Sequence, residues 1–342
     1  MLNAEVRVQG WKGAVRGTVL IAWLLLMARP LAAETHLAVI VGLGGEPEHA
    51  ETFRRWAGTL VDHATGPLAI PRERILYLLE DPAQDTKRAP GKSTRDAIEK
   101  GLRAMAAATK ADDVAFIVLI GHGTWDGKVA KFNLPGPDMT AADFAAILKT
   151  FGTKNTVFVD TTSASGPFVE ALAGTARVVV AATRSGAEKF ATLFGGYFVD
   201  ALASDAADAD KNRRISVLEA FNAAKIEVAR AYEQRGVMLT EHAVVEDGGD
   251  GEGSMDPSAN GKDGSVAAVL SLGAPTAALA LPADPKLRQL YEERRTLEQK
   301  AESLKLLKAS MPADQYASEL EKVLIELARK TQEIRAIEGK KQ

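Results

Sequence analysis

The sequence contains no cysteine among its 342 residues. A chain without thiols forms no disulfide even in an oxidising compartment, and it has neither a cysteine nucleophile nor a cysteine for lipid attachment. Its net charge of −3 gives no reason to expect nucleic-acid binding. Since 46% of the residues are hydrophobic, which is ordinary globular usage, the fold must be held by its core.

Long apolar runs are also scarce, and the only candidate lies near the start. Arg7, Lys12 and Arg16 precede an apolar run at residues 19–27, which is followed by Pro30-Leu31-Ala32-Ala33. The run is shorter than the roughly 20 residues that a bilayer span needs. We expect residues 1–33 to be a secretory signal peptide cleaved after about Ala33, which predicts a periplasmic or secreted protein with no span in its mature form. A retained membrane anchor is the alternative.

The rest of the chain alternates strand and helix patterns. Strands are predicted at 36–42, 74–79, 114–121, 155–160 and 178–183, with a further candidate at 266–272. Helices are predicted at 53–63, 93–107, 141–149 and 168–173. This alternation predicts an α/β domain whose mostly parallel sheet has helices on both faces.

Two of these strands end in small polar residues. One reads Leu119-Ile120-Gly121-His122-Gly123, and the other runs from Val157 to Asp160 and continues as Thr161-Thr162-Ser163-Ala164-Ser165-Gly166. Parallel strands of α/β folds deliver functional groups to the carboxyl edge of the sheet. We therefore expect His122 and Ser163 to lie side by side.

This pair resembles the dyad of the caspase-like cysteine peptidases, and most closely the legumain family in its bacterial secreted branch. The family carries its His in a small-His-Gly motif and its Cys in a Cys-x-Ser-Gly motif, so Ser163 stands where the nucleophilic Cys would be. The resemblance implies a three-layer sandwich over residues 34–273, with six strands in the order 2-1-3-4-5-6.

The resemblance also implies the remaining parts of a cleft. Backbone amides of Gly123 and Ser163 would form the oxyanion hole. A specificity loop would contain Thr183, Arg184, Ser185 and Glu188, with Arg184 or Glu188 setting the charge preference. A plain solvated connection is the alternative for that loop. His49 matches a legumain pocket His in rough position, although a surface His at a helix start explains it as well.

Catalysis by Ser163 would require more than catalysis by Cys. A serine hydroxyl needs a base in direct hydrogen-bond contact, and usually a third group that holds the base. Asp126 and Asp160 are the candidates near in sequence.

Residues 208–219 partly match a calcium-binding loop. The candidate ligands are Asp208, Asp210, Asn212 and Glu219, but Arg213 replaces the usual glycine. Ser216 and Glu219 also form a Ser-x-x-Glu capping box, which explains two of the matches without metal. We expect no other cofactor.

Two tracts follow. Residues 246–265 are rich in Gly and Asp and predict a mobile surface loop. Residues 285–338 repeat apolar positions at helical spacing around a break at 310–314, which predicts an antiparallel helical hairpin of coiled-coil type. The hairpin would pack on its own chain, or it would serve self-association or a partner.

Three functions fit these observations. The missing Cys favours a pseudopeptidase that binds a peptide or protein in a relict cleft. The alternatives are an active endopeptidase or hydrolase that uses Ser163 and His122, and an envelope scaffold that acts through the hairpin.

Overall fold

The computed structural model describes residues 33–88, 90–153, 155–175, 177–273, 284–306, 308 and 311–338. The predicted signal peptide lies outside the described residues except for Ala33. No helix in the described ranges is long and apolar enough to cross a membrane.

The described residues form ten strands, eight α-helices and three short 3-10 helices. The strands are β1 (Thr35–Val41), β2 (Ile75–Leu79), β3 (Gly91–Lys92), β4 (Val114–Ile120), β5 (Gly123–Trp125), β6 (Ala130–Phe132), β7 (Met139–Thr140), β8 (Asn155–Asp160), β9 (Arg177–Ala181) and β10 (Val244–Glu246). The α-helices are α1 (Pro47–Thr65), α2 (Arg95–Ala108), α3 (Ala141–Leu148), α4 (Gly166–Leu172), α5 (Phe194–Leu202), α6 (Val217–Arg235), α7 (Pro285–Leu306) and α8 (Ala313–Glu338). The 3-10 helices are Arg72–Arg74, Pro82–Asp85 and Asp205–Ala207.

The main sheet has seven strands in the order β10-β9-β8-β4-β1-β2-β3, and only β10 runs antiparallel to its neighbour. The first five predicted strands correspond to β1, β2, β4, β8 and β9, and they lie in the expected order. A small antiparallel sheet, β5-β6-β7, follows β4.

Two details of the predicted sheet are wrong. Residues 266–272 form no strand; the amides of Val266 and Ala267 are bound by the Asp247 carboxylate, and only an isolated bridge joins Ser271 to Ser216. The sixth position belongs instead to β10. The two-residue strand β3 pairs with β2 at the other edge and makes the sheet seven-stranded rather than six-stranded.

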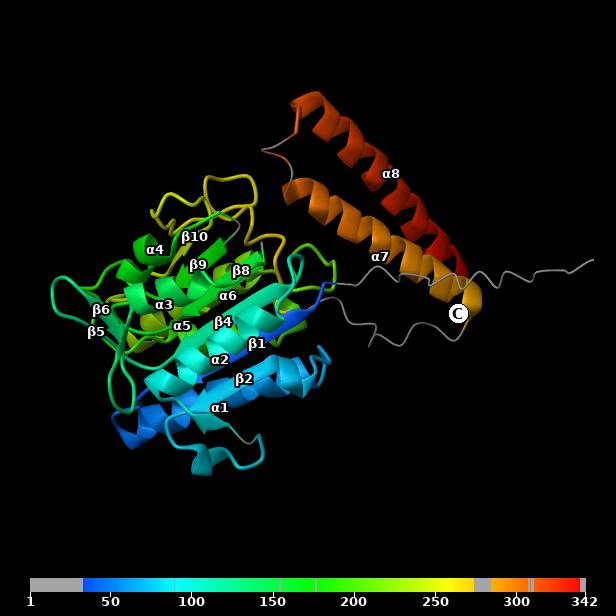
Figure 1. Ribbon diagram of the computed structural model, residues 1–342. Helices are drawn as coiled ribbons and strands as arrows, with labels where there is room; N and C mark the ends of the chain where they lie inside the picture. Colours follow the sequence, from blue (N-terminus) through cyan, green and yellow to red (C-terminus); the bar gives the residue numbers. More distant parts are fainter. Residues whose placement is uncertain are drawn as a thin grey trace, which may run out of the picture. The chain divides into compact units, whose positions relative to one another are not determined.

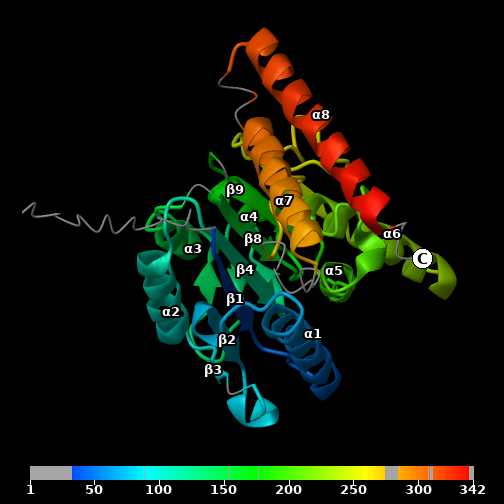
Figure 2. The same ribbon diagram turned by 90° about the vertical axis from the view of Figure 1, so that its right-hand side faces the viewer.

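Helices cover both faces of this sheet, which makes the predicted three-layer sandwich. Helices α1, α5 and α6 lie on one face, and α2, α3 and α4 lie on the other (Figures 1 and 2). Because strand side chains alternate, Leu37 and Val39 of β1 enter the first core while Ala38 and Ile40 enter the second. The strand is therefore apolar throughout.

Helix α5 was not predicted from the sequence. It contains Gly195 and Gly196, which have poor helix propensity. A Cβ at Gly196 would lie 2.6 Å from the indole of Trp56 on α1, so the glycine allows the two helices to approach closely. Tertiary packing thus overrides the local preference.

The Gly/Asp-rich segment after β10 is a loop, but its carboxylates tie it together. Asp247 is buried and accepts hydrogen bonds from the amides of Gly264, Val266 and Ala267. Asp263 accepts from the amides of Asp247 and Gly248. Carboxylate-to-amide bonds therefore replace the apolar burial that this composition lacks.

Helices α7 and α8 pair antiparallel, as the hydrophobic pattern predicted. Leu287 and Leu290 at the start of α7 pack on Ile334 near the end of α8, and Leu304 packs on Val323. Lys330 forms an ion pair of 2.7 Å with Glu293 across the two helices.

Candidate functional site

The segments that carry His122 and Ser163 lie side by side at the carboxyl edge of the main sheet. Strands β4 and β8 are paired up to Leu119 and Asp160. His122 and Ser163 each lie three residues after this last pair. The Ser163 hydroxyl donates to the Gly123 carbonyl at 3.1 Å and accepts from the Gly123 amide at 3.3 Å. The segments that carry the two residues are therefore in direct contact.

Gly123 is the residue that permits this contact. A Cβ there would collide with the Ser163 carbonyl and would lie 2.7 Å from the Thr162 hydroxyl. Its amide, for which the family resemblance implies a role in an oxyanion hole, donates to the Ser163 hydroxyl.

The His122 ring is held by backbone and aromatic groups. Its Nε2 lies 3.1 Å from the Gly44 carbonyl oxygen, which can only accept, so Nε2 carries the proton and Nδ1 is the acceptor nitrogen. The Gly44 amide in turn donates to the Glu80 carboxylate at 2.8 Å. The rings of His49 and Phe53 on α1 lie 5.0 and 5.1 Å from the His122 ring.

Burial of the His122 imidazole lowers its pKa, and the neighbouring His49 lowers it further. The hydrogen bond to Gly44 opposes this shift only in part. His122 is therefore a neutral, oriented imidazole at neutral pH.

A serine triad is not assembled around this imidazole. Within the described part of the chain, no hydrogen bond joins His122 to Ser163 or to any carboxylate. Asp160 instead accepts from the amide and hydroxyl of Thr162, and the exposed Asp126 accepts from the amides of Lys128 and Val129. Neither Asp that the sequence offered holds the histidine.

Asp160 is the most perturbed carboxyl group beside the site. It is fully buried, and burial raises its pKa to about 6 despite the two hydrogen bonds from Thr162. Its Oδ2 has no hydrogen-bond partner among the described residues. Asp160 anchors the turn that presents Ser163.

The turn after Ser163 is fastened to the end of β9. The hydroxyls of Ser165 and Thr183 lie 3.0 Å apart, and Thr183 also accepts from the Gly166 amide at 3.1 Å. Both side chains are fully buried. Ala164 has a φ of +55°, a left-handed conformation that is unusual for a residue with a side chain. Thr183 therefore shapes the turn from a fully buried position.

The loop that follows Thr183 lies along the same turn. The Glu188 carbonyl accepts from the Ala164 amide at 2.8 Å, and the Ser185 carbonyl accepts from the Glu188 amide at 3.3 Å. Gly186 packs so closely on the indole of Trp125 that a Cβ would collide with it.

The two charges of this loop have different surroundings. The Glu188 carboxylate accepts from the His242 amide at 2.8 Å and lies 3.3 Å from its Nδ1. The Arg184 side chain is exposed, and no ion pair to it is formed within the described ranges. Of these two charged side chains, only Glu188 has a charged partner within the described ranges.

Sequence reasoning missed Gly44 and His242 and gave His49 little weight. The glycine-rich stretch Gly42-Leu43-Gly44-Gly45, directly after β1, was the available signal for a close backbone approach at this edge. Nothing in the sequence indicated that His242 would reach Glu188, because 54 residues separate them.

The predicted calcium loop brings three of its acidic side chains together, but backbone amides of the same segment already donate hydrogen bonds to these carboxylates. Ligand atoms of Asp208, Asp210 and Glu219 lie within 4.8 Å of one another, and Arg213 adopts φ +67° where a glycine is usual. However, Asp208 accepts from the amides of Asn212 and Arg213, and Glu219 accepts from those of Ala209 and Ser216. The capping box of Ser216 and Glu219 at the start of α6 is present. Calcium binding stays a prediction.

Comparisons with known proteins add little to this geometry. No protein-family model matches the chain, and no curated protein matches it. Among solved structures, the chain is similar to the protein GSU0716 from Geobacter sulfurreducens at 16% identity, with a TM-score of 0.37. The match covers 62% of this chain and 92% of that one.

Proposed function

We propose that this chain is a periplasmic or secreted pseudopeptidase of the caspase-like type, which binds a peptide or protein segment in its cleft without cleaving it. The observation that carries the proposal is the bonding of Ser163. Its hydroxyl is bonded to the backbone of Gly123 rather than to His122, and the residue is only 3% exposed.

The difference between a cysteine thiol and a serine hydroxyl explains why a cleft with Ser163 in place of Cys would not be catalytic. A thiol is partly ionised near neutral pH, so a neutral, oriented imidazole nearby is enough to assist it. A hydroxyl must give its proton to a base in direct contact during attack. His122 has the neutral, oriented imidazole that would assist a thiol. It makes no hydrogen bond to the Ser163 hydroxyl, so it lacks the direct contact that a serine nucleophile needs.

The exposed positive charge of Arg184 beside the turn suggests which kind of peptide would bind. Glu188 is engaged by His242, whereas Arg184 is exposed next to the turn that carries Ser163. Lys189 and Phe190 are also exposed, and Phe190 is 71% accessible. A segment with an acidic side chain beside an apolar one complements this surface.

A peptide library captured on the immobilised protein tests the proposal. We expect selection of peptides that contain Asp or Glu, recovered at full length by mass spectrometry. The variant Arg184→Glu should reverse the selection toward Lys and Arg, while Arg103→Glu, an exposed charge on α2, should leave it unchanged. Recovery of cut peptides, or selection that ignores Arg184, would contradict the proposal.

A scaffold role of the hairpin is the second candidate. Leu324 and Ile325 on α8 are 47% and 55% exposed, and they are adjacent large apolar side chains that could contribute to an interface. The double variant Leu324→Glu and Ile325→Glu should reduce self-association in sedimentation velocity if α8 pairs with a second copy. Unchanged sedimentation of a monomer would remove this candidate.

A further inference from the structure

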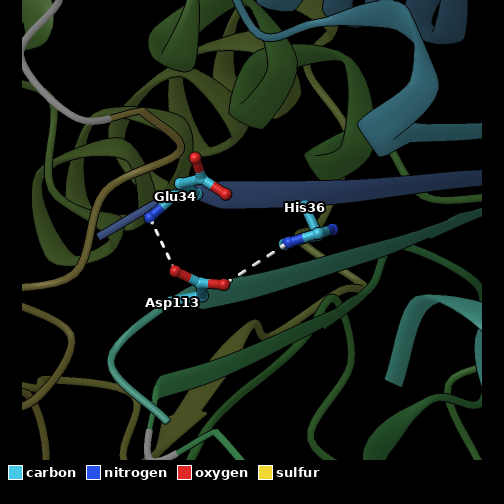
Figure 3. Close-up of side chains that lie close together, drawn as sticks. All are labelled: Glu34, His36 and Asp113. Carbon is cyan, nitrogen blue, oxygen red and sulfur yellow. Dashed lines mark hydrogen bonds and ion pairs between the residues drawn. The ribbon is translucent and has the colours of Figure 1, made fainter. Parts of the chain in front are cut away.

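A second cluster of ionisable side chains lies at the opposite, amino edge of the sheet. Glu34 directly precedes β1, His36 is its second residue, and Asp113 directly precedes β4. Because β1 and β4 are parallel partners with Thr35 opposite Val114, their first residues meet (Figure 3). One ligand atom from each of the three side chains lies within 4.8 Å of the others.

The nitrogen of His36 that faces Asp113 lacks a hydrogen bond. The His36 side chain is 7% exposed, and its Nε2 has no hydrogen-bond partner among the described residues. Figure 3 shows this ring turned toward the Asp113 carboxylate, with Nε2 at 3.6 Å from Oδ2. At this distance Nε2 is within ion-pair range of the carboxylate, but it makes no hydrogen bond, which is unusual for a buried nitrogen.

The separation of 3.6 Å is too long for a hydrogen bond but suits two ligands of one metal ion. Zinc bonds of about 2.0 to 2.1 Å at a tetrahedral angle place two donor atoms about 3.4 Å apart. A small inward movement of either side chain would bring these two donor atoms to that separation.

The surrounding contacts hold the carboxylates in place. Asp113 Oδ1 accepts from the Glu34 amide at 2.9 Å, and Oδ2 accepts from the Lys110 amide at 2.8 Å. The Glu34 carboxylate pairs with Arg74 at 2.7 Å and more loosely with Lys110 at 3.8 Å. Such outer contacts orient the first ligands of metal sites. The loose contact to Lys110 is the one that a metal ion would replace.

We propose that Glu34, His36 and Asp113 form a binding site for a divalent transition-metal ion, zinc in particular, that clamps the start of β1 to the start of β4. One imidazole nitrogen and two carboxylate oxygens suit zinc, whereas calcium and magnesium take oxygen ligands. Three protein ligands leave a fourth position for water. The site lies at the opposite edge of the sheet from His122 and Ser163.

Titration of the purified, metal-free protein with zinc chloride, followed by calorimetry, tests this site. We expect one zinc ion per chain and a thermal midpoint that rises with zinc concentration. His36→Gln and Glu34→Gln should each weaken binding at least tenfold. The matched control His63→Gln removes a histidine that lies in neither group of metal-ligating side chains, and it should leave binding unchanged.

Two results would overturn the proposal. One is the absence of zinc binding by protein whose circular dichroism shows it folded. The other is zinc binding of the original affinity in both His36→Gln and Glu34→Gln. The Glu34 side chain is 29% exposed, so Glu34→Gln keeps the test valid if His36→Gln does not fold. Cobalt as a second probe should give the visible spectrum of a four-coordinate ion, which only the intact site would show.

Discussion

Replacing Asp160 by Asn should make the stability of the protein less dependent on pH between pH 5 and pH 8. The carboxyl group is fully buried, and burial raises its pKa from 3.8 to about 6. The native state therefore binds more protons than the unfolded chain between these two values. Its contribution to stability is complete below pH 3.8 and is lost as the pH rises through about 6.

The size of the effect follows from the shift. A displacement from 3.8 to about 6 corresponds to about 3 kcal/mol of ionisation cost in the folded state. About 1.4 kcal/mol of that cost develops between pH 5 and pH 8, and the rest develops at lower pH. An asparagine at this position keeps an oxygen that can accept from Thr162, and it carries no charge.

Urea denaturation of the wild type and of Asp160→Asn at pH 5 and pH 8 measures this contribution. The difference in unfolding free energy between the two proteins should shift by about 1.4 kcal/mol in favour of the variant at the higher pH. Other buried carboxylates, such as Glu241 and Asp247, titrate in both proteins and cancel in the difference. A difference that is the same at both pH values would refute the reasoning, and Asp126→Asn, an exposed carboxylate, is the control.

Two further substitutions test the local geometry. Gly123→Ala should destabilise the fold by about 1 to 3 kcal/mol, because the new methyl group would collide with the Ser163 carbonyl. The control is Gly152→Ala, whose methyl group would meet nothing within 4 Å. Equal urea midpoints for the two variants would contradict the described contact. Ser216→Ala should lower the free energy of unfolding by about 1 kcal/mol, because it removes the side chain that caps α6. Ser216→Thr keeps a capping hydroxyl, so its unfolding free energy in the same assay should be close to that of the wild type. A Thr variant as unstable as the Ala variant would assign Ser216 another role.

The parallel core of this fold was predictable from the sequence, because buried strands read as continuous apolar runs. Residues 114–121 and 155–160 needed no context to be identified. The edge strand β10 was not predictable, since its three residues have no periodicity. Residues 266–272 have a strand-like composition, but the Asp247 carboxylate binds their amides and fixes a turn instead.

The candidate site likewise has parts that could be predicted from the sequence and parts that could not. His122 and Ser163 could be placed together because each lies within three residues of the end of a predicted strand. The group that orients His122 is a backbone carbonyl, that of Gly44, and backbone oxygens leave no residue-type signature. The partnership of Glu188 with His242 depends on the path of the chain after α6, which local patterns do not encode.

The most direct test of the relict cleft is peptide hydrolysis by the wild type, Ser163→Cys and the double variant Ser163→Cys with His122→Ala, using a fluorogenic library that varies the residue before the cut. We expect no turnover by the wild type above a Ser163→Ala background, measurable turnover by Ser163→Cys, and its loss in the double variant, because the neutral His122 can assist a thiol but not a hydroxyl. Wild-type cleavage that disappears in Ser163→Ala would contradict the claim and identify a serine hydrolase. A folded Ser163→Cys variant without turnover would show that the cleft does not hold peptides in a reactive position.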